Sequence, residues 1–317
     1  MAQTDLAIVI PAYKATFLRE TLESIANQTD KRFHLYIGDD CSPYNLKEIV
    51  DEFEGRIPMT YHRFDTNLGG TDLVSQWERC IALTHGEPWI WLFSDDDIMG
   101  PECVSAFYEV PEVIRTNSII HFNVNIINGK SEIVKKPAEY PGQISAEEYL
   151  YLKLSGKIIS YVVEFIFPRT IYDLIGGFVN FDLAWGSDFM TWLRMATETE
   201  RGIITIATTD KDNVFWRMSD ENISPNKTYA IQKRKIESLI GNAAYIRDLC
   251  KQFPNQYKDA ANEFRFVKFP FGEMLRNRNL FSLKEIHEFT THYRKRVGFP
   301  AHALACGFYI SISKLLR

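Results

Sequence analysis

The sequence contains none of the glycine-rich loops that commonly bind phosphate groups. No Gly-x-Gly-x-x-Gly motif follows its first apolar segment, and no Gly-x-x-x-x-Gly-Lys-Ser/Thr motif occurs anywhere. These absences argue against a dinucleotide-dependent oxidoreductase and against a P-loop NTPase. A Gly-x-Ser-x-Gly elbow is also missing, which argues against an α/β-hydrolase. A phosphate-containing ligand of this protein must therefore be held in another way.

Other scarce features narrow the class further. The net charge is −5, so the basic excess typical of nucleic-acid-binding proteins is lacking, and we expect no nucleic acid partner. The apolar runs fall well short of the roughly 18 residues that a membrane-spanning helix needs. The apolar segment Leu6–Ile10 is too short for a secretion signal, and the cysteines show no paired spacing. We therefore expect a protein of the reducing cytoplasm, without a zinc site or a disulfide framework.

The first hundred residues alternate between short apolar segments and segments with helical periodicity. The apolar segments predict buried strands at Leu6–Ile10, His34–Gly38, Met59–Phe64 and Trp89–Phe93. Such alternation is typical of an α/β fold with a mostly parallel central sheet between helices. In sheets of this kind, ligands bind beyond the carboxyl ends of the strands.

The remainder of the chain divides into two parts. Further strands are predicted at Ser118–Val124, Tyr161–Phe167 and Ile203–Ala207. The last part has helical periodicity throughout, so we expect an α/β domain over residues 1–225 and a helical C-terminal extension over residues 226–317. The final segment, Ala301–Arg317, is apolar with a basic tail. We expect it to pack on the core, with peripheral contact at the inner face of the cell membrane as the alternative.

Three adjacent carboxylates, Asp95, Asp96 and Asp97, directly follow the fourth predicted strand. Adjacent carboxylates repel one another unless a cation lies among them. Mg²⁺ and Mn²⁺ take carboxylate oxygens as ligands and bridge them to phosphates. The triplet therefore indicates a divalent metal at this strand end. A helix N-terminus, which acidic residues also favour, is the alternative interpretation.

The first three predicted strands also end in small or polar residues, namely Pro11-Ala12-Tyr13, Asp39-Asp40 and Asn67-Leu68-Gly69. An Asx turn with a helix cap would explain the second of these segments on its own. The carboxyl ends of parallel strands meet at one edge of a sheet. We therefore expect all these residues to line a single ligand site together with the Asp triplet.

Five segments, in chain order, resemble the motifs of the family 2 glycosyltransferases, which have the nucleotide-sugar-binding GT-A fold: IVIPAYK, IGDDCS, TNLGG, FSDDDI and GSDFMTWLR. The resemblance covers roughly residues 5–225. The segment LAWGSDFMTW after an Ile-Gly-Gly-Phe turn is similar to bacterial enzymes that build surface polysaccharides. The resemblance implies an inverting, metal-dependent enzyme that moves a sugar from a nucleotide diphosphate sugar, UDP-linked, to a hydroxyl of a glycan or lipid-linked acceptor.

The resemblance also implies roles for the residues at the strand ends. Within the triplet, Asp96 is the implied metal ligand, Asp97 supports it, and Asp95 contacts the ribose or the donor sugar. On spacing alone, a pairing of Asp95 with Asp97 is the alternative. The resemblance further implies that Pro11, Ala12 and Tyr13 contact the base and ribose and that Asp40 contacts the uracil. Asn67 and Gly69 would lie under the nucleotide, and Arg217 would contact a phosphate.

Asp188 is the implied general base. Inverting transfer needs one carboxylate near the acceptor hydroxyl to accept its proton. Ser187 stands where the family often has Glu, and Arg217-Met218-Ser219 lacks a His that many relatives carry. A helix N-cap formed by Ser187 and Asp188 is the alternative role, and it is compatible with catalysis.

Two other functions remain open on the sequence. A sugar-phosphate nucleotidyltransferase would need a glycine-rich loop with Lys or Arg after the first strand, where this chain has Tyr13-Lys14-Ala15-Thr16. A non-catalytic glycan- or nucleotide-binding protein on the same fold would not need to keep both the Asp triplet and Asp188.

Overall fold

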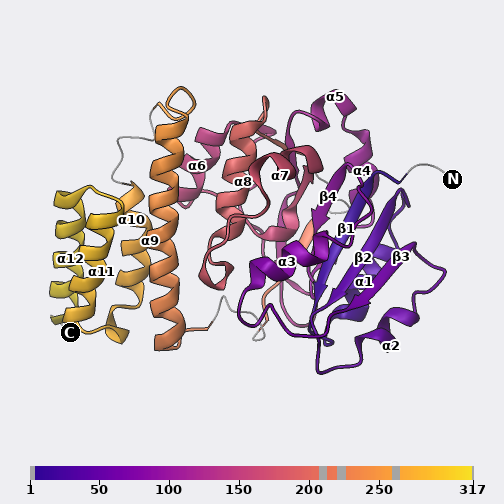
Figure 1. Ribbon diagram of the computed structural model, residues 1–317, viewed down its shortest axis with the longest axis horizontal. Helices are drawn as coiled ribbons and strands as arrows, with labels where there is room; N and C mark the ends of the chain where they lie inside the picture. Colours follow the sequence, from indigo (N-terminus) through magenta and orange to yellow (C-terminus); the bar gives the residue numbers. More distant parts are fainter. Residues whose placement is uncertain (1–3, 207–212, 220–225, 259–264, 316–317) are drawn as a thin grey trace.

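The computed structural model of the chain describes residues 4–206, 213–219, 226–258 and 265–315 (Figure 1). Three predicted positions lie outside these ranges: the strand end at Ala207, the domain boundary at residue 225 and the chain end at Arg317. The division of the chain into two domains at that boundary stays a prediction.

An eight-stranded sheet in the order β3-β2-β1-β4-β10-β6-β11-β9 forms the centre of the described structure. Strands β3, β2, β1 and β4 are parallel, whereas β10 is antiparallel to both of its neighbours. The predicted mostly parallel α/β sheet is therefore confirmed. Its strands are β1 (Leu6–Ala12), β2 (Phe33–Asp39), β3 (Met59–Arg63), β4 (Trp89–Leu92), β6 (Ile119–His121), β9 (Gln143–Ile144), β10 (Phe165–Pro168) and β11 (Ile203–Thr205).

A smaller four-stranded sheet has the order β5-β12-β7-β8. Its strands are β5 (Ile98–Met99), β7 (Val124–Ile127), β8 (Ile133–Lys135) and β12 (Val214–Arg217). The prediction of one strand over Ser118–Val124 was wrong, because the chain leaves the large sheet after His121 and enters the small one at Val124. Both strands are buried, so the apolar pattern alone does not show where the chain changes sheets.

Helices cover both faces of the large sheet, as Figure 1 shows. Along β1, Ala7 and Val9 pack in one apolar cluster, and Leu6, Ile8 and Ile10 pack in another. The first cluster includes side chains of α3 (Leu73–Ile81), α6 (Ala146–Leu154), α7 (Arg169–Ile175) and α8 (Ser187–Glu198). The second includes side chains of α1 (Leu18–Ala26), α2 (Leu46–Asp51) and α4 (Cys103–Glu109), and α5 (Glu112–Arg115) follows α4. Burial on both faces explains why β1 reads as a continuous apolar run.

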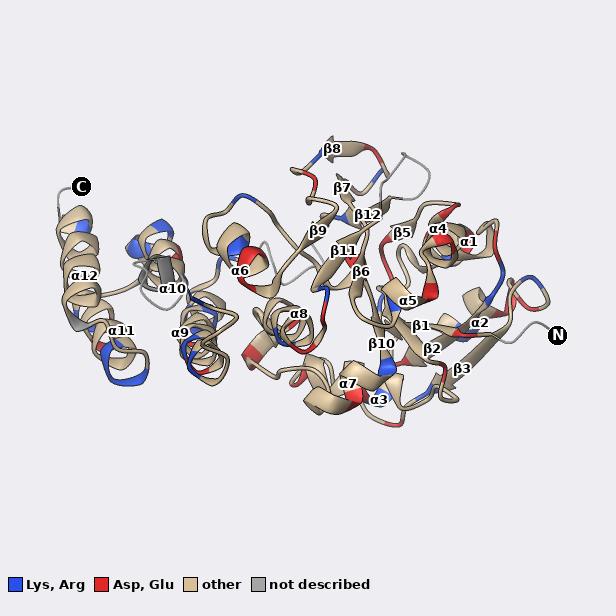
Figure 2. Ribbon diagram, turned by 90° about the horizontal axis from the view of Figure 1, so that it is seen from above, with Lys and Arg blue, Asp and Glu red and all other residues tan. Residues whose placement is uncertain are grey.

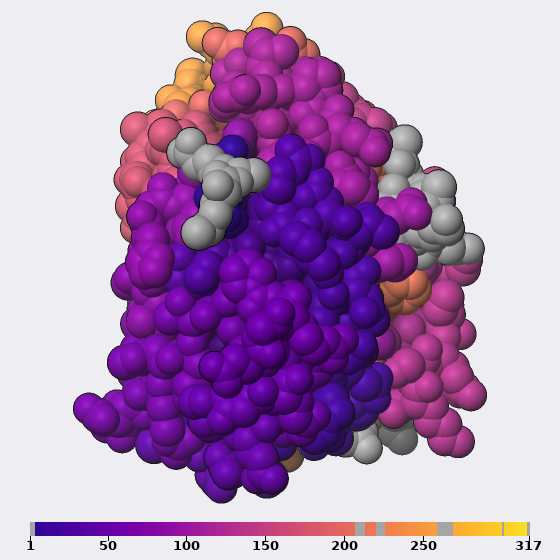
Figure 3. Space-filling view, turned by 90° about the vertical axis from the view of Figure 1, so that its right-hand side faces the viewer, coloured from indigo at the N-terminus to yellow at the C-terminus, as the bar shows by residue number. Residues whose placement is uncertain are grey.

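The C-terminal part is helical, as predicted. It comprises α9 (Tyr229–Gln252), α10 (Arg265–Arg276), α11 (Leu283–Arg296) and α12 (Pro300–Leu315). One side of α9 joins the first cluster of the large sheet through Ile246 and Leu249, and the other side packs in a third cluster with α10, α11 and α12. Figure 2 shows these helices extending away from the sheet, and Figure 3 shows that the N-terminal part of the chain forms the opposite end. No helix in the described ranges is long and apolar enough to cross a membrane.

Candidate active site

Asp95, which lies shortly after β4, links the carboxyl ends of β1 and β4 through hydrogen bonds. Strand β1 lies between β2 and β4, with Ala12 beside Asp39 of β2. The backbone N–H groups of Tyr13 and Lys14 both donate to Asp95 Oδ2, at 2.8 and 2.7 Å. One oxygen of Asp95 thus fixes the loop after β1, where Tyr13 is 42% exposed, and Pro11 and Ala12 are the last two residues of β1. The structure brings these predicted residues to one edge.

The side chain of Lys14 places a cation among the carboxylates of the triplet. Its Nζ contacts Asp96 Oδ2 and lies 3.5 Å from Asp95 Oδ1. Burial lowers the pKa of Lys14, but the three carboxylates outweigh it, so the pKa is raised. The charge argument from the sequence required a cation here and considered only a metal. Lys14 was not predicted to be this cation, although its position shortly after the first strand placed it at the same edge of the sheet.

Asp97 faces the second sheet. Its Oδ1 accepts a hydrogen bond from the backbone N–H of Arg217 at 2.6 Å, and its carbonyl accepts one from Thr21 Oγ1 at 2.8 Å. Burial and the neighbouring Asp96 raise the pKa of Asp97 well above its usual range. Among the described residues, no group of three or more His, Cys, Asp or Glu side chains is arranged to hold a metal ion.

The carboxylate of Asp96 differs from its neighbours, because those of Asp95 and Asp97 accept backbone N–H groups and that of Asp96 contacts side chains. Its two oxygens meet the side chains of Lys14 and Ser94. Lys14 brings a positive charge to one of these oxygens, as a metal ion would. A single carboxylate is a sufficient protein ligand where phosphate oxygens and water complete the coordination, which is common for Mg²⁺.

The guanidinium group of Arg217 is fully buried and points into the protein. Its Nε donates to the carbonyl of Asp96 at 2.7 Å, one terminal nitrogen donates to the carbonyl of Asn128 at 3.0 Å, and the other contacts Glu20 at 2.9 Å. A bidentate phosphate contact would require these bonds to break. The geometry therefore does not fit the expected phosphate contact and fits a structural link between β12, the triplet and the loop after β7.

Asp40 holds the loop after β3. Its Oδ1 accepts from the backbone N–H of Leu68 at 2.7 Å, and its Oδ2 accepts from Asn67 Nδ2 at 2.9 Å and from the Gly69 N–H at 2.8 Å. Arg79 of α3 also pairs with Oδ1. A Cβ at Gly69 would lie 2.7 Å from Asp40 Oδ2, so only glycine fits this close approach. The sequence did not indicate Arg79, which lies on a helix far along the chain.

These bonds limit how Asp40 meets a ligand. A carboxylate offers about four acceptor positions, and the four donors named above use them. A uracil N3–H therefore needs one of the two side-chain donors, Asn67 or Arg79, to turn aside. Asn67 is exposed, whereas only 22% of the Arg79 side chain is exposed and its guanidinium packs on the ring of Phe64, 3.9 Å from the centroid.

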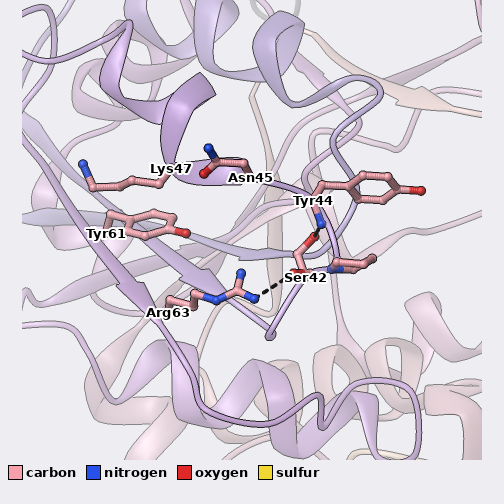
Figure 4. Close-up of a pocket in the computed structure, with 7 residues that line it drawn as sticks. Ser42, Tyr44, Asn45, Lys47, Tyr61 and Arg63 are labelled. Atoms are coloured by element: carbon pink, nitrogen blue, oxygen red, sulfur yellow. Dashed lines mark hydrogen bonds between the residues drawn. The ribbon is translucent and has the colours of Figure 1, made fainter.

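A pocket opens beside this region, on the outer side of the loop after β2 (Figure 4). Tyr61 and Arg63 line it, and both donate to Asp39 Oδ2, at 2.5 and 2.7 Å. Asp39 therefore has a structural role at this strand end. The rest of the lining is Ser42, Pro43, Tyr44, Asn45 and Lys47, so the pocket contains no residue predicted for the active site.

Asp188 lies in the first turn of α8. The N-cap is Gly186, with φ +86°, so the alternative interpretation of Ser187 and Asp188 as the helix N-cap is wrong. Ser187 is used elsewhere, since its Oγ accepts from the backbone N–H of Phe181 at 3.0 Å. Burial raises the pKa of Asp188, and the ammonium group of Lys153 and nearby backbone N–H groups offset part of this rise. A raised carboxylate pKa suits a group that accepts a proton.

A buried polar cluster lies behind Asp188. His121, at the end of β6, contacts Glu164 Oε2 through Nε2 at 2.9 Å, and burial lowers the pKa of His121 to about 3. Burial raises the pKa of Glu164 well above its usual range, and Lys153 opposes this rise. Lys153 also lies over the ring of Phe189, 5.2 Å from its centroid. The sequence did not indicate this cluster, because His121, Lys153 and Glu164 lie on separate elements.

Tyr161 connects the triplet with Asp188. Burial raises the pKa of Tyr161, and the nearby carboxylates of Glu164, Asp97 and Asp188 add to this rise. Its ring stacks on Trp216 with centroids 4.1 Å apart and an angle of 11°. The carboxylates of Asp97 and Asp188 are therefore both near enough to Tyr161 to affect its pKa.

Comparison with known proteins identifies the family of this chain. Residues 7–165 match the Glycosyl transferase family 2, so the chain belongs to this family. An uncharacterized glycosyltransferase of Haemophilus influenzae is 30% identical over 156 residues. That match covers 48% of this chain and 49% of the relative, so the chain spans about half the length of that protein.

Solved structures share the fold. Staphylococcus aureus TarS residues 1–349, in complex with UDP-GlcNAc, has a TM-score of 0.59 at 11% identity, with 98% of this chain and 92% of that chain covered. A mannosyltransferase of Pyrobaculum calidifontis, in complex with GDP-Man and Mn²⁺, has a TM-score of 0.55 at 13% identity, with 99% and 88% covered. The GT-A fold expected from the sequence is therefore confirmed.

Proposed function

We propose that this protein is an inverting glycosyltransferase that moves one sugar from a UDP-sugar to a hydroxyl of a glycan or lipid-linked acceptor. Family membership supports the transferase class, and the carboxylate of Asp96 at the end of β4 is the observation that carries the proposal. Similar folds hold UDP-GlcNAc in TarS and GDP-Man in the mannosyltransferase, which supports a nucleotide-sugar donor.

The donor would bind across the ends of β1, β2 and β4. We propose that Pro11, Ala12 and Tyr13 contact the base and ribose, where Tyr13 offers an exposed ring. Asp40 would accept from the uracil N3–H after one of its two side-chain donors, Asn67 or Arg79, turns aside. Asn67 and Gly69, which Asp40 holds in place, would lie under the nucleotide.

The diphosphate would lie at the triplet. We propose Asp96 as the metal ligand, with Asp97 supporting its position and Asp95 holding the loop after β1 while its other oxygen faces the ribose or donor sugar. A bound Mn²⁺ or Mg²⁺ would neutralise the charge that develops on the departing diphosphate. The ammonium group of Lys14 would move from Asp96 to the phosphates. Arg217 is proposed as a positioning residue for the triplet.

The acceptor would lie between the Tyr161–Trp216 pair and Asp188. Asp188 would accept the proton of the acceptor hydroxyl as its oxygen bonds to the anomeric carbon of the donor sugar. The bond from that carbon to the diphosphate breaks on the opposite face, so the anomeric configuration inverts. General-base catalysis of this kind contributes about 10²–10⁴-fold in rate.

The proposed setting is the cytoplasmic side of a bacterial cell membrane, in the synthesis of a surface polysaccharide. The segment LAWGSDFMTW, which is similar to enzymes of that process, supports this part of the proposal. A lipid-linked acceptor would be presented there, and nucleotide sugars would reach the enzyme from the cytoplasm.

Calorimetry with UDP and Mn²⁺, followed by UDP release from a panel of nucleotide sugars, tests the proposal. We expect Asp96→Ala to weaken Mn²⁺-dependent UDP binding by at least about tenfold, because the metal loses its protein ligand. Wild-type binding by that variant would remove Asp96 from the metal site. Failure to release UDP from any sugar nucleotide, with UDP binding intact, would favour a non-catalytic nucleotide-binding protein.

A further inference from the structure

Helix α12 turns a continuous apolar face outward. Its large side chains Leu304, Phe308, Tyr309, Ile312 and Leu315 are 45, 69, 62, 37 and 68% exposed. Their spacing of three and four residues places them on one side of the helix. Ala301 and Ala305 are exposed on the same side, so the face contains no Lys, Arg, Asp or Glu. We call these seven residues the outer stripe.

The opposite side of α12 is packed against the protein. Ala303 and Ile310 are buried in the third apolar cluster, and a Cβ at Gly307 would lie 2.3 Å from Thr290 Oγ1 of α11. The position of α12 is therefore set by close contact with α11, and the outer stripe is the side that remains. Figures 1 and 2 show α12 as the outermost helix, at the end of the molecule farthest from β1, β2 and β3.

Basic side chains lie at both ends of the stripe. Arg294, Lys295 and Arg296 are exposed in the last turn of α11, next to the start of α12. Lys314 lies near the end of α12, where its Nζ is 3.3 Å from the carbonyl oxygen of Arg278. The chain as a whole has a charge of −5, but residues 265–317 contain ten Lys or Arg and three Asp or Glu. This part therefore carries +7 and the rest of the chain carries −12.

We propose that the outer stripe binds the surface of an anionic lipid bilayer. An apolar helix face of this kind enters the boundary between headgroups and acyl chains, and nearby Lys and Arg are attracted to anionic headgroups. At about 1.5 Å per residue, α12 would lie along the surface for about 24 Å. The proposal specifies the membrane contact of the proposed function, but it does not depend on sugar transfer. A failure of vesicle binding would therefore contradict only this proposal, and a failure of UDP release would contradict only the proposed function.

The test is co-sedimentation of the full chain with lipid vesicles. We expect binding to vesicles of phosphatidylcholine with about one-third phosphatidylglycerol, weaker binding to phosphatidylcholine alone, and a loss of this difference at high salt. Phe308→Ser with Leu315→Ser should reduce binding at least about tenfold, because it removes the two most exposed apolar side chains of the stripe. Arg294→Gln, Lys295→Gln and Arg296→Gln together should remove the preference for anionic lipid.

Leu174→Ser is the matched control, since Leu174 is 63% exposed on α7, away from the stripe. We expect it to bind vesicles as the wild type does. UDP release should be unchanged in the Phe308→Ser, Leu315→Ser variant, which shows that it is folded. Absence of wild-type binding to anionic vesicles, or equal binding by this variant, would overturn the proposal. A wild-type dimer that this variant converts to a monomer, without vesicle binding, would instead identify the stripe as a contact between two copies.

Discussion

The ammonium group of Lys14 contacts the carboxylate of Asp96 and lies 3.5 Å from the nearer oxygen of Asp95. Both carboxylates are buried, and 23% of the Lys14 side chain is exposed. Three adjacent carboxylates need a compensating cation. Lys14 provides it in the structure, so a metal at Asp96 would have to displace this ammonium group.

The first prediction follows from this competition. Lys14→Met should tighten Mn²⁺ binding without nucleotide about tenfold, because the metal no longer displaces an ammonium group. The same change should lower the free energy of unfolding without metal by about 2–3 kcal/mol, because buried carboxylates lose their partner. Manganese titration calorimetry and urea unfolding measure the two effects. Lys47→Met is the control, since the Lys47–Asp51 pair is exposed. Unchanged values for both quantities would contradict the inferred competition.

A second prediction concerns Asp188 and pH. Asp188→Asn should lower kcat by about 10³-fold and leave the affinity for UDP within about twofold, because the amide accepts no proton and the proposed donor site is at the triplet. In the wild type, burial raises the pKa of Asp188. The base works deprotonated, so kcat should fall as the pH decreases through this raised pKa. Nearly full turnover by Asp188→Asn would place the base elsewhere.

A third prediction concerns the effect of Lys153 on the pKa of Asp188, the proposed base. Its ammonium group lowers the pKa of Asp188, opposing the effect of burial. Lys153→Met should therefore raise the pKa of Asp188 and move the acid side of the kcat profile to higher pH, by about one unit. Lys153→Arg should restore the wild-type profile. Lys157→Met is the control, because Lys157 is exposed and lies over the ring of Tyr151 instead. An unshifted profile in Lys153→Met would show that Lys153 is merely structural.

Variants of Arg217 distinguish a structural role from a contact with phosphate. Arg217→Met should destabilise the fold by about 3 kcal/mol or more, because buried carbonyls of Asp96 and Asn128 lose their donors. Urea unfolding measures this loss. Arg217→Lys keeps the charge but not the fork of donors, and it should also be destabilised. Full stability in both variants with weakened UDP binding would restore the phosphate contact inferred from the sequence.

Gly186 offers a test of how the loop before Asp188 is held. It has φ +86°, and a Cβ would lie 2.1 Å from Asn242 Nδ2 of α9. Gly186→Ala should cost about 2–4 kcal/mol, since backbone strain and a close contact add. At Gly86, φ is +98° and nothing lies within 4 Å, so Gly86→Ala measures the backbone strain alone. Adding Asn242→Ala should recover part of the stability of Gly186→Ala. Equal losses for Gly186→Ala and Gly86→Ala would show that the Asn242 contact is not limiting.

The first half of the fold is predictable from the sequence because its strands are buried on both faces. Continuous apolar runs located β1 and β4 to within a few residues, and the polar residues after them marked the edge of the sheet. The direction of β10 was not predictable. An antiparallel strand and a parallel strand that are both buried on two faces have the same apolar pattern.

Apart from Asp188, which the family resemblance indicated, the candidate site was predictable where its residues closely follow strands. Asp95 and Asp40 are such residues, and the structure places both at the expected edge. The side chains that contact the residues of the site were harder to predict from the sequence. Arg79 lies 39 residues from Asp40 on a helix whose other positions predict only a helix, and the partners of Arg217 lie 86 or more residues away. Side-chain contacts between distant elements depend on packing, which periodicity does not encode.

Side chains of helix α9 hold the loop before Asp188 in place by hydrogen bonds. Asn242 Nδ2 donates to the carbonyl of Trp185 at 3.0 Å, and Ser238 Oγ donates to the carbonyl of Asp182 at 2.9 Å. A chimaera that joins residues 1–225 to the helices of a relative would therefore keep the strand ends of the large sheet but lose the hydrogen bonds that hold this loop. The smallest exchangeable unit extends through α9. Replacing this helix would therefore alter the support of the loop before Asp188 without altering any residue at the ends of the strands.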